Sequence, residues 1–178
     1  KKYKKLTVYS RLVLIISAVL TFGGAAIYAK LEWHNPATLG GMTAGGKLLA
    51  ALFQSVTTRT AGFYTIPQGA LTGASKAVTD VLMLIGGSSG STAGGVKTVT
   101  MGVLLLSVLA AARGRSRVTV FRRTITAQQV RDAVAVVTMV FLAAFISGIY
   151  LSVASGLDYM DCIYEAISAI ATVGLSTG

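Results

Sequence analysis

Two long uncharged apolar stretches dominate the hydrophobic pattern of the chain. The first runs for eighteen residues from Leu12 to Ala29, and the second runs for twenty-five residues from Ala133 to Leu157. An α-helix rises about 1.5 Å per residue, so each stretch can cross a hydrocarbon core of about 30 Å. The pattern therefore predicts two membrane-spanning helices, which we assign to residues 11–30 and 132–157.

A third apolar stretch, residues 72–113, is interrupted at its centre. The thirty-two residues between Asp80 and Arg113 would form a straight helix of about 48 Å, which is half again too long for the bilayer core. We therefore expect a broken helix, because ten residues at its middle include five glycines and no large side chain and such a sequence forms helix poorly. These residues are Gly86, Gly87, Ser88, Ser89, Gly90, Ser91, Thr92, Ala93, Gly94 and Gly95.

Irregular backbone is tolerated at membrane depth only where it is buried in protein or lines a watery cavity. We interpret the Gly/Ser-rich segment as a mobile gate in such a cavity. A passive break that merely fits the span to the bilayer is one alternative. An ordinary loop between two soluble elements is the other.

Composition supports a membrane protein over a soluble enzyme or a disordered chain. Of the 178 residues, 53% are hydrophobic and 12% are charged, and the mean hydropathy is +0.70. Soluble domains usually contain about 45–50% apolar and about 25% charged residues. The single cysteine excludes an intrachain disulfide, and the single histidine further weakens a metal-centre hypothesis.

The net charge of +10 comes mainly from two clusters, residues 1–11 and 113–131. The positive-inside rule places both clusters in the cytoplasm of a multi-pass plasma-membrane protein, with 114–131 as a basic linker. Nucleic-acid binding would require an exposed basic face with stacking aromatic residues. The basic runs are short and flank apolar spans, so we expect membrane lipid and no nucleic acid among the partners.

The chain contains an internal repeat with an offset of 112 residues. The segment Leu49–Thr65 aligns with Asp161–Thr177, and each segment reads as a half-length apolar helix followed by Thr-x-Gly. Such a helix is too short to cross the bilayer. We divide the chain into a first repeat, a linker and a partial second repeat. The boundaries are 1–113 (span 11–30, pore helix and filter 42–65, broken span 72–113), 114–131, and 132–178 (span 132–157, pore helix and filter 158–178).

This repeat unit is suited to an ion filter. A short helix that ends at mid-membrane points its negative C-terminal end at the bilayer centre, which favours a cation. The loop that follows can replace the hydration shell of the cation with backbone carbonyls. Two loops cannot surround an ion, so we expect half of a pseudo-fourfold pore. The expected carbonyl ligands are those of Thr60, Ala61, Gly62, Phe63, Thr172, Val173, Gly174 and Leu175.

A nucleotide site is a weaker interpretation of Gly90–Thr98, which is similar to a phosphate-binding P-loop. That motif requires lysine directly after its second glycine, whereas Val96 stands between Gly95 and Lys97. The chain also lacks the βαβ alternation that accompanies such loops. We therefore expect a transporter rather than an enzyme, with a P-loop protein as a remote alternative.

Three motifs together resemble the Trk/Ktr/HKT superfamily of potassium transporters, most nearly the membrane subunit of a bacterial Ktr or Trk system. They are Ser55–Phe63, Ile85–Thr98 and Ala166–Gly178. The resemblance implies an all-α membrane fold of four span–re-entrant pore loop–span repeats around a potassium-channel-like pore. This chain would supply the third repeat and most of the fourth, and would be part of a longer protein.

The resemblance also carries expectations about ligands and partners. It implies potassium as the transported ion with no other cofactor, a homodimer, and a cytosolic nucleotide-binding regulatory ring. Thr172–Gly174 is similar to the start of a potassium-channel filter, but Leu175 and Ser176 depart from it, so a sodium or sodium-coupled pathway stays an alternative. Charges expected to support the filter or the break are Arg59, Lys97 and Glu165, with Glu165 considered as a counter-ion across the repeat interface.

Overall fold

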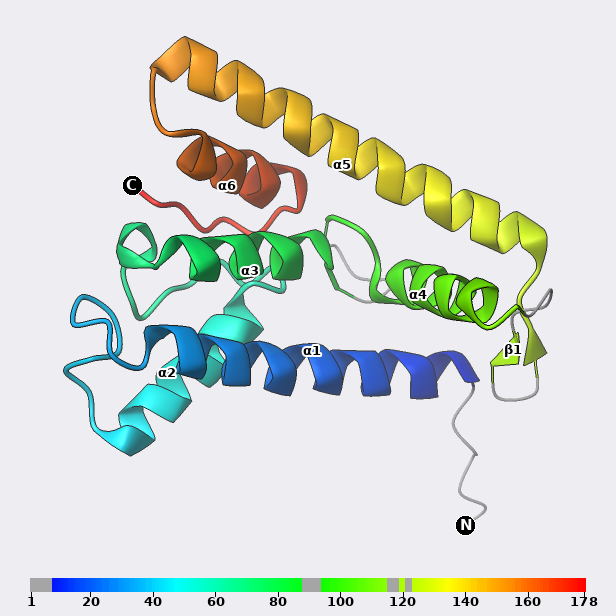
Figure 1. The fold of residues 1–178 in the computed structure, drawn as a ribbon, viewed down its shortest axis with the longest axis horizontal. Helices are drawn as coiled ribbons and strands as arrows, with labels where there is room; N and C mark the ends of the chain where they lie inside the picture. The colour runs from blue at the N-terminus through cyan, green and yellow to red at the C-terminus, as the bar shows by residue number, and fades with distance from the viewer. Residues whose placement is uncertain (1–7, 88–93, 115–118, 121–122) are drawn as a thin grey trace.

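The structure is a computed structural model that describes residues 8–87, 94–114, 119–120 and 123–178. Six α-helices and one 3₁₀ turn make up most of the described chain (Figure 1). They are α1 (Val8–Glu32), α2 (Ala44–Thr57), η1 (Gln68–Ala70), α3 (Gly73–Leu84), α4 (Thr98–Ala112), α5 (Ala127–Ser155) and α6 (Tyr159–Ile170). The expected helical fold is confirmed, with one addition: β1 (Thr119–Val120) and β2 (Arg123–Thr124) form a small antiparallel hairpin in the basic linker.

The two long helices, α1 and α5, are the candidate membrane spans. By length and composition, Ser10–Glu32 and Ala127–Ser155 could each cross a bilayer. Only 11% of the most apolar window in either helix is buried within the chain. Most of their apolar surface is therefore free to face lipid or further protein.

The two short helices that precede the expected filter loops, α2 and α6, begin at polar caps. The hydroxyl of Thr43 accepts a hydrogen bond from the backbone N–H of Gly46 at the start of α2, and the carboxylate of Asp158 accepts one from Met160 at the start of α6. With 14 and 12 residues, the helices are only about 21 and 18 Å long, which is less than the bilayer core. Each one ends where a filter loop was expected.

The third crossing is broken at the expected place. Helix α3 ends at Leu84 and α4 begins at Thr98. The residue that follows α3 and a residue shortly before α4 lie side by side. Ile85 and Val96 form a parallel bridge, and the N–H of Val96 donates to the carbonyl of Leu84 at 2.9 Å. Of the expected gate, residues 88–93 lie outside the described residues.

The described helix ends that adjoin the two basic clusters lie on one side of the molecule. The start of α1, the end of α4 and the start of α5 lie together at one end of the molecule (Figure 1). The connection from α1 to α2 and the turn from α5 to α6 lie at the opposite end. Arg11 lies in the first turns of α1 and Arg113 caps the end of α4, which agrees with the cytoplasmic placement of both clusters.

This arrangement predicts the labelling of two engineered cysteines in the complete protein. Gly41→Cys, at an exposed position of the α1–α2 connection, should react with an impermeant thiol reagent added outside intact cells. Gln128→Cys, exposed in the first turn of α5, should react only after the cells are permeabilised. Cys162 is buried and is replaced by serine in both variants. Labelling of Gln128→Cys but not Gly41→Cys from outside would invert the topology.

Candidate functional site

The two loops that follow the short helices share an unusual backbone conformation. We call Thr58–Thr65 the first filter loop and Ala171–Gly178 the second filter loop. Thr60 and Thr172 have φ values of 67° and 55°, and Gly62 and Gly174 have φ values of 76° and 87°. Positive φ is uncommon for non-glycine residues, and in the described part of the chain only these two threonines adopt it. The backbone therefore repeats with the offset found in the sequence.

The sign of φ alternates along each loop. Ala61 and Val173, which separate each threonine from its glycine, are not among the described residues with positive φ. An alternating sign of φ can turn successive peptide carbonyls toward the same side of a loop. Backbone carbonyls presented in this way replace the water around a cation.

The two filter loops touch each other at their glycines. A Cβ atom on Gly62 would lie 2.4 Å from the carbonyl oxygen of Val173 and 3.6 Å from the Cα of Gly174. A Cβ atom on Gly174 would lie 3.9 Å from the Cα of Gly62. Only glycine fits at residue 62 without displacing the other loop.

Two of the eight expected carbonyl ligands are engaged by hydroxyl groups of the short helices. The hydroxyl of Thr57 donates to the carbonyl of Phe63, and the hydroxyl of Ser168 donates to the carbonyl of Leu175 at 2.6 Å. These bonds direct both carbonyls toward the helix ends. The carbonyls without such a contact to the preceding helix belong to Thr60, Ala61, Gly62, Thr172, Val173 and Gly174.

The second filter loop is packed into the core, whereas much of the first is open. Val173 is 4% exposed and Leu175 is 1% exposed, and both lie in a hydrophobic cluster with Met83. Phe63 of the first loop is 72% exposed. Within this chain, α3 therefore supports the second loop from behind, and the surface around Phe63 is available to further protein.

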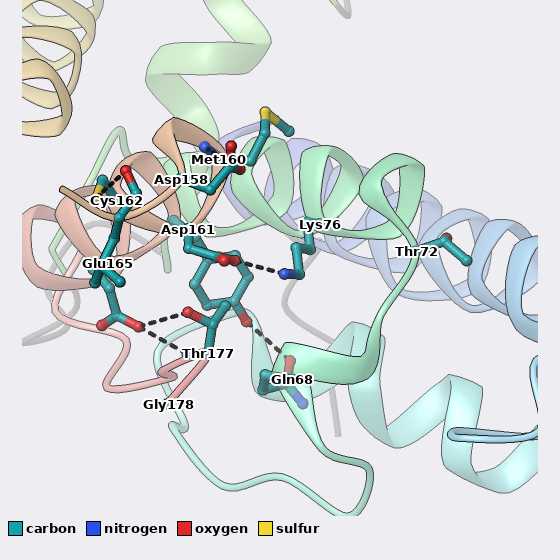
Figure 2. Close-up of polar contacts among 12 residues, drawn as sticks. Gln68, Thr72, Lys76, Asp158, Met160, Asp161, Cys162, Glu165, Thr177 and Gly178 are labelled. Carbon is teal, nitrogen blue, oxygen red and sulfur yellow. Dashed lines mark hydrogen bonds and ion pairs between the residues drawn. The ribbon is translucent and has the colours of Figure 1, made fainter. Parts of the chain in front are cut away.

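Glu165 holds the outer end of the second filter loop (Figure 2). One of its carboxylate oxygens accepts hydrogen bonds from the hydroxyl of Ser176 at 2.8 Å and from the N–H of Thr177 at 2.7 Å. On the other side, a Cβ atom on Gly69 would lie 2.5 Å from the carbonyl oxygen of Thr177. The loop end is thus held between α6 and η1, and Glu165 acts within its own repeat instead of pairing with Arg59.

Arg59 lies in the first filter loop, directly before Thr60, and joins this loop to α1 and α4. Its guanidinium group donates to the hydroxyl of Ser17 in α1 at 3.2 Å and to the hydroxyl of Thr98 in α4 at 3.3 Å. Its Nε atom is buried without a hydrogen-bond partner among the described residues. Lys97, the third expected charge, occupies the N-cap position of α4.

A buried polar network, which the sequence analysis did not identify, connects the two short helices. The amide groups of Gln54 in α2 and Gln68 in η1 hydrogen-bond to each other at 2.6 and 3.1 Å. The hydroxyl of Tyr164 in α6 donates to the same oxygen of Gln68 at 2.9 Å. The signal in the sequence was a glutamine within the apolar helix that precedes the first filter loop.

Charged groups fix the outer ends of α3 and α6. Lys76 of α3 and Asp161 of α6 form an ion pair at 2.5 Å (Figure 2). The carboxylate of Glu32, at the end of α1, accepts hydrogen bonds from the hydroxyl of Thr38 at 2.7 Å and from the N–H of Thr72 at 3.0 Å. These contacts join α3 to α6, and they join the end of α1 to the connection that follows it and to the start of α3.

Comparisons with known proteins agree with this geometry. A family model described as "TrkH: Cation transport protein" matches residues 5–178. The chain is similar to the Ktr system potassium uptake protein B of Vibrio alginolyticus, with 34% identity over all of this chain and 39% of that protein. It is also similar to the potassium/sodium uptake protein NtpJ of Enterococcus hirae, with 37% identity over 99% of this chain and 40% of that protein.

A solved structure supports the fold independently. The potassium transporter TrkH of Vibrio parahaemolyticus superposes with a TM-score of 0.61 and 24% identity, over 93% of this chain and 35% of that one. The chain therefore spans about two fifths of the length of the curated relatives described above.

Proposed function

Because the chain belongs to the TrkH family of cation transport proteins, we propose that it forms part of a pathway for potassium across the plasma membrane. The observation that carries the proposal is the pair of filter loops with the same alternating φ values, in contact at Gly62 and Val173. Such loops offer several hard oxygen ligands without a charged side chain, which suits a weakly held monovalent cation. The name of the Enterococcus relative includes sodium, so sodium is the alternative ion.

We assign the ion ligands to six carbonyls. They are those of Thr60, Ala61, Gly62, Thr172, Val173 and Gly174, since the carbonyls of Phe63 and Leu175 bind hydroxyl groups. Two loops supply half of a ring around an ion. The complete pore therefore needs two further loops, in keeping with the repeat boundaries 1–113 and 132–178, the second of which is partial.

The break between α3 and α4 is the proposed gate. The end of the break that precedes α4 lies against the second filter loop: a Cβ atom on Gly94 would be 2.8 Å from the carbonyl oxygen of Ala171, and one on Gly95 would be 3.3 Å from the Cβ of Ala171. A segment in contact with the start of a filter loop can obstruct an ion until it moves. Its glycines lower the cost of alternative conformations.

The partners of the complete protein are proposed as well. The Vibrio relative is named as a protein of a Ktr system, which supports a protein that works with separate subunits. We propose that the partner is a cytosolic nucleotide-binding regulatory ring and that the protein forms a homodimer, as the family resemblance implies. The basic collar Arg113–Arg123 is the proposed surface for the regulator. Potassium is then the transported ion, and no further cofactor is invoked.

Uptake of rubidium, a tracer for potassium, tests the proposal. The complete protein, expressed in cells that lack their own potassium uptake systems, should restore growth at low potassium and accumulate rubidium. Excess potassium should suppress the accumulation, and excess sodium should suppress it less. Equal suppression by sodium would favour the sodium alternative. Retention of labelled ATP by the purified membrane protein in equilibrium dialysis, without rubidium uptake, would favour the P-loop alternative.

A further inference from the structure

An apolar groove runs between α1 and α3. Helix α3 lies between α1 and α6 and packs against both of them (Figure 1). The groove has a volume of about 500 Å³, and every residue that lines it is apolar or glycine. Two of the lining side chains are largely open to the outside, since Val19 of α1 is 64% exposed and Val81 of α3 is 56% exposed. The groove is therefore available to an apolar ligand.

The groove matches the depth of one membrane leaflet. With both basic clusters in the cytoplasm, α1 ends on the outer side at Glu32, and the lining residues of α1 extend from Val19 to Ile27. This distance is about 12 Å along the helix, whereas the hydrocarbon of one leaflet is about 15 Å deep. Trp33 directly follows α1, and tryptophan is enriched where a membrane meets water. The groove thus lies in the outer leaflet, with its mouth near the lipid headgroups.

A further helix does not fit into this groove. An α-helix with its side chains is about 10 Å wide, so a segment 12 Å long occupies about 900 Å³. That volume is nearly twice the volume of the groove. A single acyl chain is much thinner than a helix and has no polar group along its length. The size and the lining of the groove therefore favour a lipid tail.

Positive charge lies at the outer mouth of the groove. Lys30 follows Ile27 by three residues, so it lies on the same face of α1 about one turn further out. Its side chain is exposed, and in the part of the chain that the structure describes it forms no ion pair. On α3, Ala74 precedes the lining residue Ala77 in the same way. Ala74 belongs to the first turn, where N–H groups without intrahelical partners carry partial positive charge.

The carboxylate of Glu32 joins the two helix ends at this mouth. It accepts hydrogen bonds from the N–H and the hydroxyl of Thr72, the N-cap residue of α3, at 3.0 and 2.7 Å. The last turn of α1, which contains Lys30, is therefore held beside the start of α3. The other oxygen of Glu32 accepts hydrogen bonds from Asn35 and Thr38 at 2.6 and 2.7 Å, and the side chain is fully buried. Its negative charge is thus bound by local donors and shielded from the mouth.

We propose that the groove binds an acyl chain of an anionic phospholipid, whose phosphate group lies against Lys30 and the first turn of α3. The site is separate from the filter loops, so the proposal does not depend on which ion the protein carries. In this position the lipid packs against α3, the helix that supports the second filter loop through Met83.

A photoreactive lipid tests the proposal. The complete transporter in detergent micelles is mixed with phosphatidylglycerol that carries a diazirine in one acyl chain, and the adducts are mapped by mass spectrometry. We expect adducts on the residues of α1 and α3 that line the groove. Unlabelled phosphatidylglycerol should suppress them at about a fivefold lower concentration than phosphatidylcholine, the effect of one basic residue near an anionic lipid. A groove without adducts would show that another part of the protein covers it, and equal suppression would refute the anionic headgroup.

Two matched tryptophan variants test the place of the acyl chain. Ala77→Trp puts an indole ring into the groove and should abolish the adducts there. Ala18→Trp makes the same change at an exposed position of α1 that does not line the groove, and it should keep the adducts. Equal adduct yields in the two variants would mean that the lipid lies elsewhere on the surface.

A second pair of variants tests the headgroup and involves no change in the groove. Lys30→Gln should make phosphatidylglycerol and phosphatidylcholine equally effective competitors. Arg131→Gln removes the same charge from an exposed position near the cytoplasmic start of α5, and it should leave the preference for phosphatidylglycerol unchanged. If Ala77→Trp does not fold, this pair decides the question. An unchanged preference in Lys30→Gln would overturn the proposed position of the phosphate.

Discussion

Gly62→Ala should reduce rubidium uptake by the complete transporter roughly tenfold or more, or abolish its preference for potassium over sodium. The added Cβ atom would lie 2.4 Å from the carbonyl oxygen of Val173, so the second filter loop must move to admit it. The φ value of 76° adds strain, because a left-handed conformation costs a residue with a Cβ about 1–2 kcal/mol. A barrier raised by about 1.4 kcal/mol is a tenfold loss of rate. Uptake and competition by sodium measure both effects at matched expression.

Two further glycines provide matched controls. Gly174→Ala introduces the same kind of backbone strain, with φ at 87°, but its Cβ would lie 3.9 Å from the nearest atom, the Cα of Gly62. It should therefore have a smaller effect than Gly62→Ala. Gly23→Ala, in α1, would place a Cβ with nothing within 4 Å and should leave uptake unchanged. Wild-type uptake and selectivity in both filter variants would refute the assignment of the loops.

The repeat explains why two matching loops could be predicted from the sequence. An offset of 112 residues between two Thr-x-Gly segments is a local property of the sequence, and the matching φ values of Thr60 and Thr172 show that it is also a local property of the backbone. The break was predictable for a similar reason, because consecutive glycines in an over-long apolar segment disfavour helix whatever surrounds them.

The partners of the polar side chains could not be predicted in this way. The sequence suggests Glu165 as a counter-ion across the repeat interface, but its carboxylate binds Ser176 and Thr177 in its own repeat. Arg59 binds the hydroxyls of Ser17 and Thr98. These pairings depend on how α1, α4 and α6 pack, and a hydroxyl in an apolar segment gives no sign of which distant donor it will meet.

The two filter loops also differ more than their sequences suggest. Val173 and Leu175 are buried against Met83 of the preceding repeat, whereas Phe63 is exposed. The second loop is thus supported by a helix of the first repeat. If the repeats are arranged around one axis, the exposed surface of the first loop is the place where an earlier repeat would pack.

Gln68→Ala should destabilise the protein by about 2–4 kcal/mol, a large effect for one side chain in a connecting turn. Gln68 is 2% exposed, and its loss leaves the amide of Gln54 and the hydroxyl of Tyr164 without this shared partner. Each buried polar group left unpaired costs about 1–3 kcal/mol. The two short helices would also lose the contact that fixes their spacing. Denaturant unfolding of the purified protein in detergent measures the free energy, and rubidium uptake measures the effect on the filter.

A graded series identifies the network as the cause. Tyr164→Phe removes one donor and leaves the reciprocal bonds between Gln54 and Gln68, so it should cost only about 1 kcal/mol. Gln128→Ala changes an exposed glutamine on α5 and should stay within about 0.5 kcal/mol of the wild type. Equal stability of Gln68→Ala and Gln128→Ala would show that the network does not hold the short helices together. A loss of uptake in Gln68→Ala at temperatures where it stays folded would show that the spacing of α2 and α6 sets the geometry of both filter loops.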